Sequence, residues 1–196
     1  MRVLVACEYS GVVRDAFTRR GHDAVSCDLL PTDSAGKHYQ QDVFEVINDG
    51  WDLMIAHPPC TYMANSGVSH LKKGPDRWYQ LFNAATFFNS LLDANISKIC
   101  VENPIMHKYA KCMIGNRNQT QVIQPWMFGH AEKKATCLWL KGLPPLVETD
   151  NVKAKMETLP KNQQQRLHYL PPSPDRWKLR STTYQGIADA MAEQWG

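Results

Sequence analysis

Two short motifs in this chain carry residue types that can do covalent chemistry. His57-Pro58-Pro59-Cys60 supplies a thiol, and Glu102-Asn103-Pro104 supplies a carboxyl group 42 residues after that cysteine. A thiolate is a strong, soft nucleophile, and a carboxyl group beside it can move a proton to or from the molecule under attack. The pair is typical of a catalytic site in which Cys60 is the nucleophile and Glu102 moves the proton.

Each motif directly follows a short apolar run that is typical of a buried parallel strand. Leu53-Met54-Ile55-Ala56 precedes the first motif, and Lys98-Ile99-Cys100-Val101 precedes the second. Ligands of open α/β sheets bind at the carboxyl ends of the strands. We therefore expect Cys60 and Glu102 to face one crevice.

The first thirty residues predict a strand–loop–helix–strand unit. Residues 2–7 read as a strand, residues 8–11 as a turn, and residues 12–20 as a helix that Gly21 closes. A second strand, 24–27, ends in Asp28. An acid about 20 residues after the first turn is the arrangement of a nucleotide-type ribose site.

Further elements complete an α/β pattern. Apolar residues at helical spacing over 75–94 predict the longest helix and place Trp78 and Phe82 in its core stripe. Short helices are expected over 43–48 and 105–110, strands over 120–125 and 135–140, and a closing helix near the end of the chain.

The two motifs resemble, in order and approximate spacing, the catalytic motifs of the DNA cytosine-5 methyltransferases. The resemblance implies a Rossmann-like, S-adenosylmethionine-dependent methyltransferase fold, with a mostly parallel sheet and a terminal hairpin. It also implies that Cys60 adds to carbon 6 of cytosine and that Glu102 contacts ring nitrogen 3. Burial is expected to raise the pKa of Glu102, so that the carboxyl group is protonated when it acts. The alternatives are an inert buried cysteine and an ordinary Asn-Pro turn.

The resemblance extends to the cofactor. The segment 4–17 is similar to the family's first motif, which implies S-adenosylmethionine contacts, although Tyr9 stands where a small residue is usual and Gly11 alone remains of the glycines. Asp28 would hold the ribose, and Asp42 would lie near the adenine. The alternatives are an ordinary βα turn, a loop acid and a helix cap. The full set of expected cofactor contacts is Glu8, Tyr9, Ser10, Gly11, Asp28, Leu29, Asp42, Pro58 and Ala188.

Two later segments also match the family. In the hairpin region Gly129 keeps its place, Glu132 replaces a glutamine, and Lys134 replaces an arginine that contacts cytosine and its phosphates, so Lys134 is the third expected catalytic residue. A lysine supplies charge without the bidentate fork of an arginine. Alternatively, Lys134 is part of a solvated hairpin tip. The segment 180–192 resembles the final motif, whose helix completes the cofactor pocket.

The family's separate target-recognition domain has no counterpart here. The segment 141–179 is short and interrupted by prolines. We therefore expect it to be irregular and to lie within a single catalytic domain, 1–196. Such a compact chain fits a phage-type enzyme that binds DNA mainly through its phosphates and recognises about one to three bases. The expected phosphate contacts are Lys72, Lys73, Lys133, Lys134, Arg166, Arg176, Lys178 and Arg180.

Composition narrows the class of protein. The chain has 196 residues, of which 43% are hydrophobic, and a net charge of +3 that permits a nucleic-acid partner. Six scattered cysteines without paired spacing indicate reduced thiols and no metal site. No signal peptide or membrane-length apolar run is evident, so a cytoplasmic protein without a membrane partner is expected.

These features predict methyl transfer from S-adenosylmethionine to carbon 5 of cytosine in duplex or single-stranded DNA, through a covalent Cys60 adduct. Three alternatives stay open. The same chemistry could act on a free pyrimidine nucleotide or on single-stranded nucleic acid. The chain could be a non-catalytic descendant that binds cofactor or DNA. A second chain, either a DNA-reading partner or another copy, could complete it.

Overall fold

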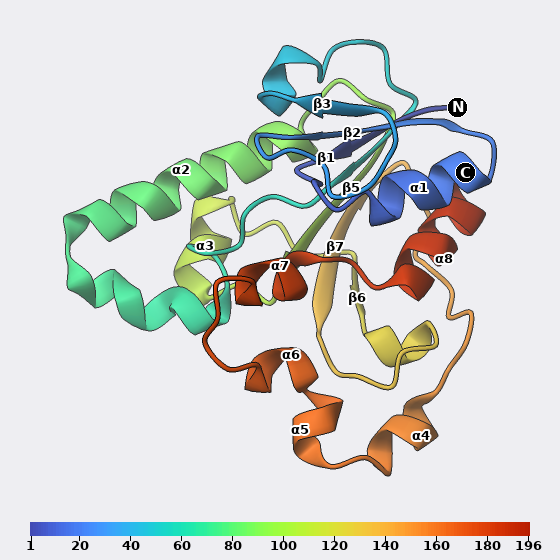
Figure 1. Cartoon of the computed structure of the whole chain (residues 1–196). Helices are drawn as coiled ribbons and strands as arrows, with labels where there is room; N and C mark the ends of the chain where they lie inside the picture. Colours follow the sequence, from blue (N-terminus) through green and yellow to red (C-terminus); the bar gives the residue numbers. More distant parts are fainter.

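A seven-stranded mixed sheet forms the centre of the computed structural model, which describes residues 1–196 (Figure 1). The strand order is β3-β2-β1-β4-β5-β7-β6. The first five strands are parallel, and β7 runs antiparallel to both β5 and β6. The predicted Rossmann-like α/β fold with a terminal hairpin is therefore confirmed. The strands are β1 (Arg2–Ala6), β2 (Asp23–Asp28), β3 (His38–Gln40), β4 (Leu53–Ala56), β5 (Lys98–Pro104), β6 (Gln121–Ile123) and β7 (Thr136–Lys141).

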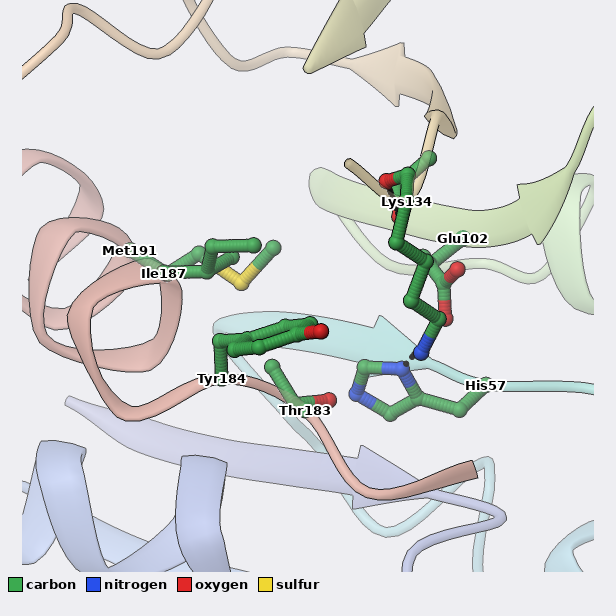
Figure 2. Close-up of a pocket in the computed structure, with 8 residues that line it drawn as sticks. His57, Glu102, Lys134, Thr183, Tyr184, Ile187 and Met191 are labelled. Carbon is green, nitrogen blue, oxygen red and sulfur yellow. Dashed lines mark hydrogen bonds and ion pairs between the residues drawn. The ribbon is translucent and has the colours of Figure 1, made fainter. Parts of the chain in front are cut away.

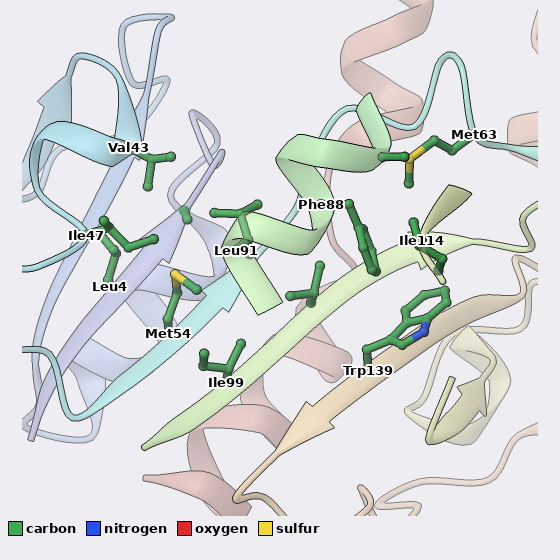
Figure 3. Close-up of a cluster of buried hydrophobic side chains, with 14 of the residues drawn as sticks. Leu4, Val43, Ile47, Met54, Met63, Phe88, Leu91, Ile99, Ile114 and Trp139 are labelled. Atoms are coloured by element: carbon green, nitrogen blue, oxygen red, sulfur yellow. The ribbon is translucent and has the colours of Figure 1, made fainter. Parts of the chain in front are cut away.

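Helices cover both faces of the sheet. On one face, α1 (Val12–Arg19) packs against α8 (Gln185–Trp195). On the other lie η1 (Val43–Glu45), α2 (Pro75–Leu92) and α3 (Lys108–Met113), and Figure 3 shows Phe88 and Leu91 of α2 above the strands. Alternate strand residues divide between the two faces: Leu4 and Met54 belong to the α2 core, whereas Val3 and Leu53 belong to the α1–α8 core. Burial on both faces explains why the central strands read as continuous apolar runs.

Several elements differ from expectation. The three-residue strand β3 was not predicted. β5 continues through Pro104, because Asn103 and Pro104 pair with β7, and α3 therefore begins at Lys108 rather than at 105. His107 caps this helix by accepting a hydrogen bond from the backbone N–H of Ala110 at 3.0 Å.

The segment 141–179 contains short helices where an irregular segment was expected. They run as α4 (Lys153–Glu157), α5 (Lys161–Gln164) and α6 (Arg166–Tyr169), and α7 (Arg176–Ser181) follows at the end of the segment. Each has only four to six residues, and Met156 and Leu167 are the buried side chains among them.

The core stripe of α2 is narrower than predicted. Leu81, Phe88 and Leu91 are fully buried, but Trp78 and Phe82 are exposed to 37% and 57%. The assignment of these two aromatic residues to the core was wrong. The reason is geometric: the first turns of α2 extend past the edge of the sheet, where no strand lies beneath them (Figure 1).

α2 is also the longest helix, with 18 residues. No helix of the structure combines the length and the apolar composition that crossing a lipid bilayer requires.

We predict opposite outcomes for two phenylalanines of α2. Phe88→Ala should lower the free energy of unfolding by about 3–5 kcal/mol, because it leaves a cavity beside Trp139, whose ring centroid is 5.0 Å away. Phe82→Ala should change it by no more than about 0.5 kcal/mol, since that ring faces solvent. Urea unfolding followed by circular dichroism measures both, and equal effects would contradict this division of the helix.

Candidate active site

The paired ends of β4 and β5 bring a histidine and a glutamate together. Ala56 is level with Val101 in the parallel register, so the next residues, His57 and Glu102, lie side by side. β4 ends before His57, whereas Glu102 is still paired with β7. His57 Nδ1 lies 3.0 Å from Glu102 Oε2, and both side chains are largely buried (Figure 2). His57 Nε2 is buried without a partner. The strand register therefore creates a His–Glu pair with one ring nitrogen left for another group.

The loop that carries Cys60 is fixed at both sides of the cysteine. Asn103 donates a hydrogen bond from Nδ2 to the carbonyl of Pro58 at 3.3 Å. The backbone N–H groups of Met63 and Ala64 both donate to the carbonyl of Cys60, at 3.0 and 2.9 Å. These bonds hold the thiol, which is half-buried, beside the end of β5.

Opposing charges act on the Cys60 thiol. Its pKa is raised, first by burial and then by the negative charge of Glu102, while Lys134 and Arg180 act in the opposite direction. The free protein therefore holds Cys60 mainly as a thiol at neutral pH.

The pKa of Glu102 is not raised, as burial alone would predict. Burial raises the pKa of this carboxyl group, but the hydrogen bond and charge of His57, together with the charge of Lys134, outweigh burial and leave the pKa lowered. The expectation of a carboxyl group kept protonated by burial was wrong for the free protein. The reason is the histidine, to which the sequence analysis gave no role.

Lys134 reaches the same place from the antiparallel strand. It lies just before β7, and Pro104 at the end of β5 pairs with Thr136 at the start of β7. Lys134 Nζ donates a hydrogen bond to the carbonyl of Arg180 at 2.8 Å, and its side chain extends toward His57 and Glu102 (Figure 2). It is a part of the site rather than only a hairpin tip.

One pocket joins these residues to the loop after β1. It is lined by Cys7, Glu8, Tyr9, Ser10, His57, Pro58, Pro59, Cys60, Glu102, Pro104, Lys134, Arg180, Ser181, Thr182 and Thr183. We call this the central pocket. A smaller side pocket adjoins it at His57, Glu102, Lys134 and Thr183, and is closed by Tyr184, Ile187 and Met191 (Figure 2).

Glu8 has a structural task within the central pocket. Its carboxylate is buried and accepts hydrogen bonds from the backbone N–H groups of Val13, at 2.7 Å, and Arg14, at 3.2 Å, as well as from the hydroxyl of Ser10. It thereby neutralises the N-terminal end of α1. Cys7 before it has a positive φ of 58°, which turns the chain sharply at the end of β1.

Tyr9 connects this loop to α7. Its hydroxyl group lies 3.0 Å from Ser181 Oγ, and its ring packs 5.4 Å from the ring of Trp177. Lys178 adds an ion pair with Asp33 at 3.2 Å. The segment that precedes the closing helix is thus fastened across the central pocket.

Asp28 and Asp42 lie near each other at the ends of β2 and β3. Both carboxylates help to raise the pKa of the Cys7 thiol, although burial is the main cause. Each also makes a local bond: Asp28 accepts from the backbone N–H of Leu30 at 2.9 Å, and Asp42 caps η1 by accepting from Phe44 at 3.0 Å. The acids therefore gather beside the central pocket without lining it.

Two other expected cofactor contacts lie elsewhere. Leu29 is exposed, and Ala188 is fully buried in the α1–α8 core; neither lines the central or the side pocket. A glycine is required at position 11 for a structural reason and not for cofactor contact. Its φ is 74°, and a Cβ there would collide with Arg14 and Ser34.

The roles of two residues were not predicted from the sequence. His57 was part of the quoted motif, and the signal that would have paired it with Glu102 was that each directly follows its apolar run, 53–56 or 98–101. Arg14 is fully buried, and its guanidinium group binds Ser26 and Thr32 and the carbonyl of Ala35, which anchors the loop after β2. A buried arginine on α1 has no signal in a single sequence.

The expected phosphate contacts divide into free and paired cations. Arg166 is paired with Glu132 at 3.0 Å and Lys178 with Asp33, so both are partly neutralised. The others, Lys72, Lys73, Lys133, Lys134, Arg176 and Arg180, form no ion pair with a carboxylate.

Comparison with known proteins gives similarity in fold. No family model and no curated protein matches the chain. Solved structures that resemble it include a prophage-encoded E. coli protein assigned as a DNA modification methyltransferase (15% identity, TM-score 0.44), the Entamoeba histolytica methyltransferase EhMeth (13%, 0.46) and the S. pombe methyltransferase Dnmt2 (15%, 0.41).

The matches cover 71%, 77% and 89% of this chain, and 46%, 57% and 60% of the respective proteins. The chain therefore spans about half of the length of the structures that it resembles. At this identity the likeness concerns the fold alone.

We predict that two substitutions shift the pKa of Cys60 in opposite directions. Glu102→Gln should lower it, because a negative charge that disfavours the thiolate is removed. Lys134→Gln should raise it, because a positive charge that favours the thiolate is lost. The pH dependence of iodoacetamide alkylation, read at the Cys60 peptide by mass spectrometry, measures both shifts. Cys112, exposed on α3, is the internal reference. Shifts of the same sign would contradict this charge arrangement.

Proposed function

We propose that this protein transfers a methyl group from S-adenosylmethionine to carbon 5 of a cytosine in DNA, through a covalent adduct with Cys60. The observation that carries the proposal is the central pocket. Cys60, Glu102 and the loop after β1 line a single hollow, so that a nucleophile, a proton carrier and a cofactor loop share one space.

The residues of the pocket divide the chemistry between them. The thiolate of Cys60 forms a bond from Sγ to carbon 6 of the ring, and the electrons of the ring double bond move toward carbon 5 as nitrogen 3 gains a proton. Once carbon 5 carries the methyl group, its hydrogen leaves as a proton to solvent, the double bond between carbons 5 and 6 forms again, and Cys60 leaves as thiolate. Nitrogen 3 then returns its proton to Glu102. Lys134 and Arg180 favour the thiolate at both steps.

The proton for nitrogen 3 is held between His57 and Glu102. In the protonated form of His57, the ring shares its Nδ1 proton with Glu102 over 3.0 Å, and the carboxyl group can pass this proton to the base. Glu102 can therefore be ionised in the free protein and still act as an acid. His57 is a positioning residue, since it acts on the substrate through Glu102.

The chemistry of the pocket suits S-adenosylmethionine, which would supply the methyl group as an electrophile. Tyr9 offers an aromatic edge, and Asp28 and Asp42 are acceptors for hydroxyl and amino groups beside the loop after β1. Glu8 is less suited to a direct contact, because backbone N–H groups of α1 already occupy its carboxylate.

A free pyrimidine nucleotide or a single strand is the second candidate substrate. The observation that favours it is the segment 141–179, whose helices are too short to build a separate core for reading a duplex. Transfer of tritiated methyl groups to duplex DNA, single-stranded DNA and free dCMP, measured in parallel, separates these substrates. Absence of transfer to all three would contradict the proposed activity.

We predict that Cys60→Ser abolishes methyl transfer and leaves S-adenosylmethionine affinity nearly unchanged. A serine hydroxyl is a much weaker nucleophile at neutral pH, whereas nothing assigns the thiol to holding the cofactor. Methyl transfer assays and calorimetry give the two readouts. A substrate with 5-fluorocytosine should form a stable adduct at Cys60, since fluorine cannot leave as a proton does. An active enzyme without this adduct in intact-mass analysis would exclude the covalent route.

We predict that Asp28→Ala weakens S-adenosylmethionine binding by about 1.5–3 kcal/mol, the scale of a lost charge-assisted hydrogen bond. Asp23→Ala is the matched control, because Asp23 stands at the opposite end of the same strand and pairs with Lys37 at the surface. Titration calorimetry compares the two variants with the parent. Equal affinities for all three proteins would place the ribose elsewhere.

A further inference from the structure

The first turns of α2 present aromatic side chains to solvent. Tyr79 is exposed to 68% and Phe82 to 57%, and Trp78 and Tyr109 of α3 are exposed as well. Trp78 and Tyr109 meet edge to face, with ring centroids 5.0 Å apart. Four aromatic rings in one exposed area of a small domain indicate a binding surface.

Positive charges without a carboxylate partner lie in the same segments as these rings. The segments 61–82 and 104–113 carry five basic side chains and one acid, Asp76, and hence a net charge of +4, whereas the whole chain carries +3. The five are Lys72, Lys73, Arg77, Lys108 and Lys111, and none of them forms an ion pair. We call these side chains, with Trp78, Tyr79, Phe82 and Tyr109, the α2–α3 face.

The α2–α3 face is joined directly to the loop of Cys60. The guanidinium group of Arg77 lies 4.2 Å from the ring centroid of Tyr62 and donates to the carbonyl of Thr61 at 3.3 Å. From the other side, His107 Nε2 lies 2.9 Å from the carbonyl of Tyr62, and Ala64 bridges to Met106. Figure 1 shows α2, α3 and the 3-10 helix η2 (Asn65–Lys73) together on the side away from α8. A polymer bound along this face would therefore extend toward the Cys60 nucleophile.

We infer that the α2–α3 face binds the single-stranded nucleic acid that flanks the target base. Positive charge selects a polyanion, and exposed rings select one whose bases are unstacked, because bases in a duplex already stack on each other. The inference rests on the proposed function for the identity of the target, but it commits this surface to single strands. It also gives the compact chain a way to hold a substrate without a separate recognition domain.

The test is binding of fluorescein-labelled dT12 to the full chain without cofactor, followed by fluorescence anisotropy, with a 12-base-pair duplex in parallel. The single strand should bind more tightly than the duplex. Tyr79→Ala/Phe82→Ala should weaken binding of dT12 at least about fivefold, the effect of losing one base–aromatic stack of about 1 kcal/mol. The control is Tyr39→Ala, which removes an exposed ring on β3, in another part of the sheet, and should bind as the parent does.

A second pair of variants tests the charge. Lys72→Gln/Lys73→Gln should reduce the slope of log affinity against log salt by about 1.4, since each phosphate contact to a single strand contributes about 0.7. Unchanged dT12 affinity in the aromatic double variant, tighter binding of the duplex, or no binding of dT12 by the parent would each overturn the inference.

Activity assays keep this inference separate from the proposed function. The aromatic double variant should lose methyl transfer to single-stranded DNA and keep transfer to dCMP, which is too small to reach the α2–α3 face. A parent that binds dT12 through this face but transfers no methyl group would end the proposed function and leave the surface standing. If the parent and the aromatic double variant methylate single-stranded DNA equally well, and dCMP equally well, the inference about the α2–α3 face is overturned and the proposed function stands.

Discussion

The position of every reactive group in this chain depends on the parallel pairing of β4 with β5. The register that sets Ala56 beside Val101 also sets His57 beside Glu102, and it fixes the loop of Cys60 through the bond from Asn103 to Pro58. β7 then adds Lys134, because an antiparallel strand that begins beside Pro104 must enter where β5 ends. A one-residue slip would turn these side chains to the opposite face of the sheet.

The same pairing creates an electrostatic conflict that the site must resolve. A thiolate at Cys60 and a carboxylate at Glu102 repel each other, and burial disfavours both charges. His57 stabilises the carboxylate directly, whereas Lys134 acts on both groups. Passing a proton from the His57–Glu102 pair to the base leaves Glu102 ionised and places the positive charge on the ring that the thiolate attacks. Protonation of the base and attack by the nucleophile would then be coupled through one proton.

The sequence predicted the sheet and the two motifs well, because both depend on local patterns. Apolar runs followed by turn residues identified β1, β2, β4 and β5, and their common edge brought Cys60 and Glu102 into one pocket. Contacts between distant segments had no local pattern. The pairing that extends β5 through Pro104 joins residues at least 32 apart in the sequence, and the bond from Tyr9 to Ser181 joins residues 172 apart. Arg14 is held by the irregular loop after β2.

The apolar residues of α2 were predicted to be buried along the whole helix, but only those that lie over the sheet are. Apolar periodicity tells which residues share a helical face, but not how far along the helix that face meets the sheet. Phe88 lies over β5 and β7 and is buried, whereas Phe82, six residues earlier, lies beyond the sheet edge and is exposed. The segments that form the α2–α3 face, 61–82 and 104–113, carry a net charge of +4, and the remaining residues together carry −1. A polyanion approaching the protein would therefore be attracted to this face before it met the pocket. The order of events would be set by charge: first the α2–α3 face, then the loop of Cys60 that is bonded to it.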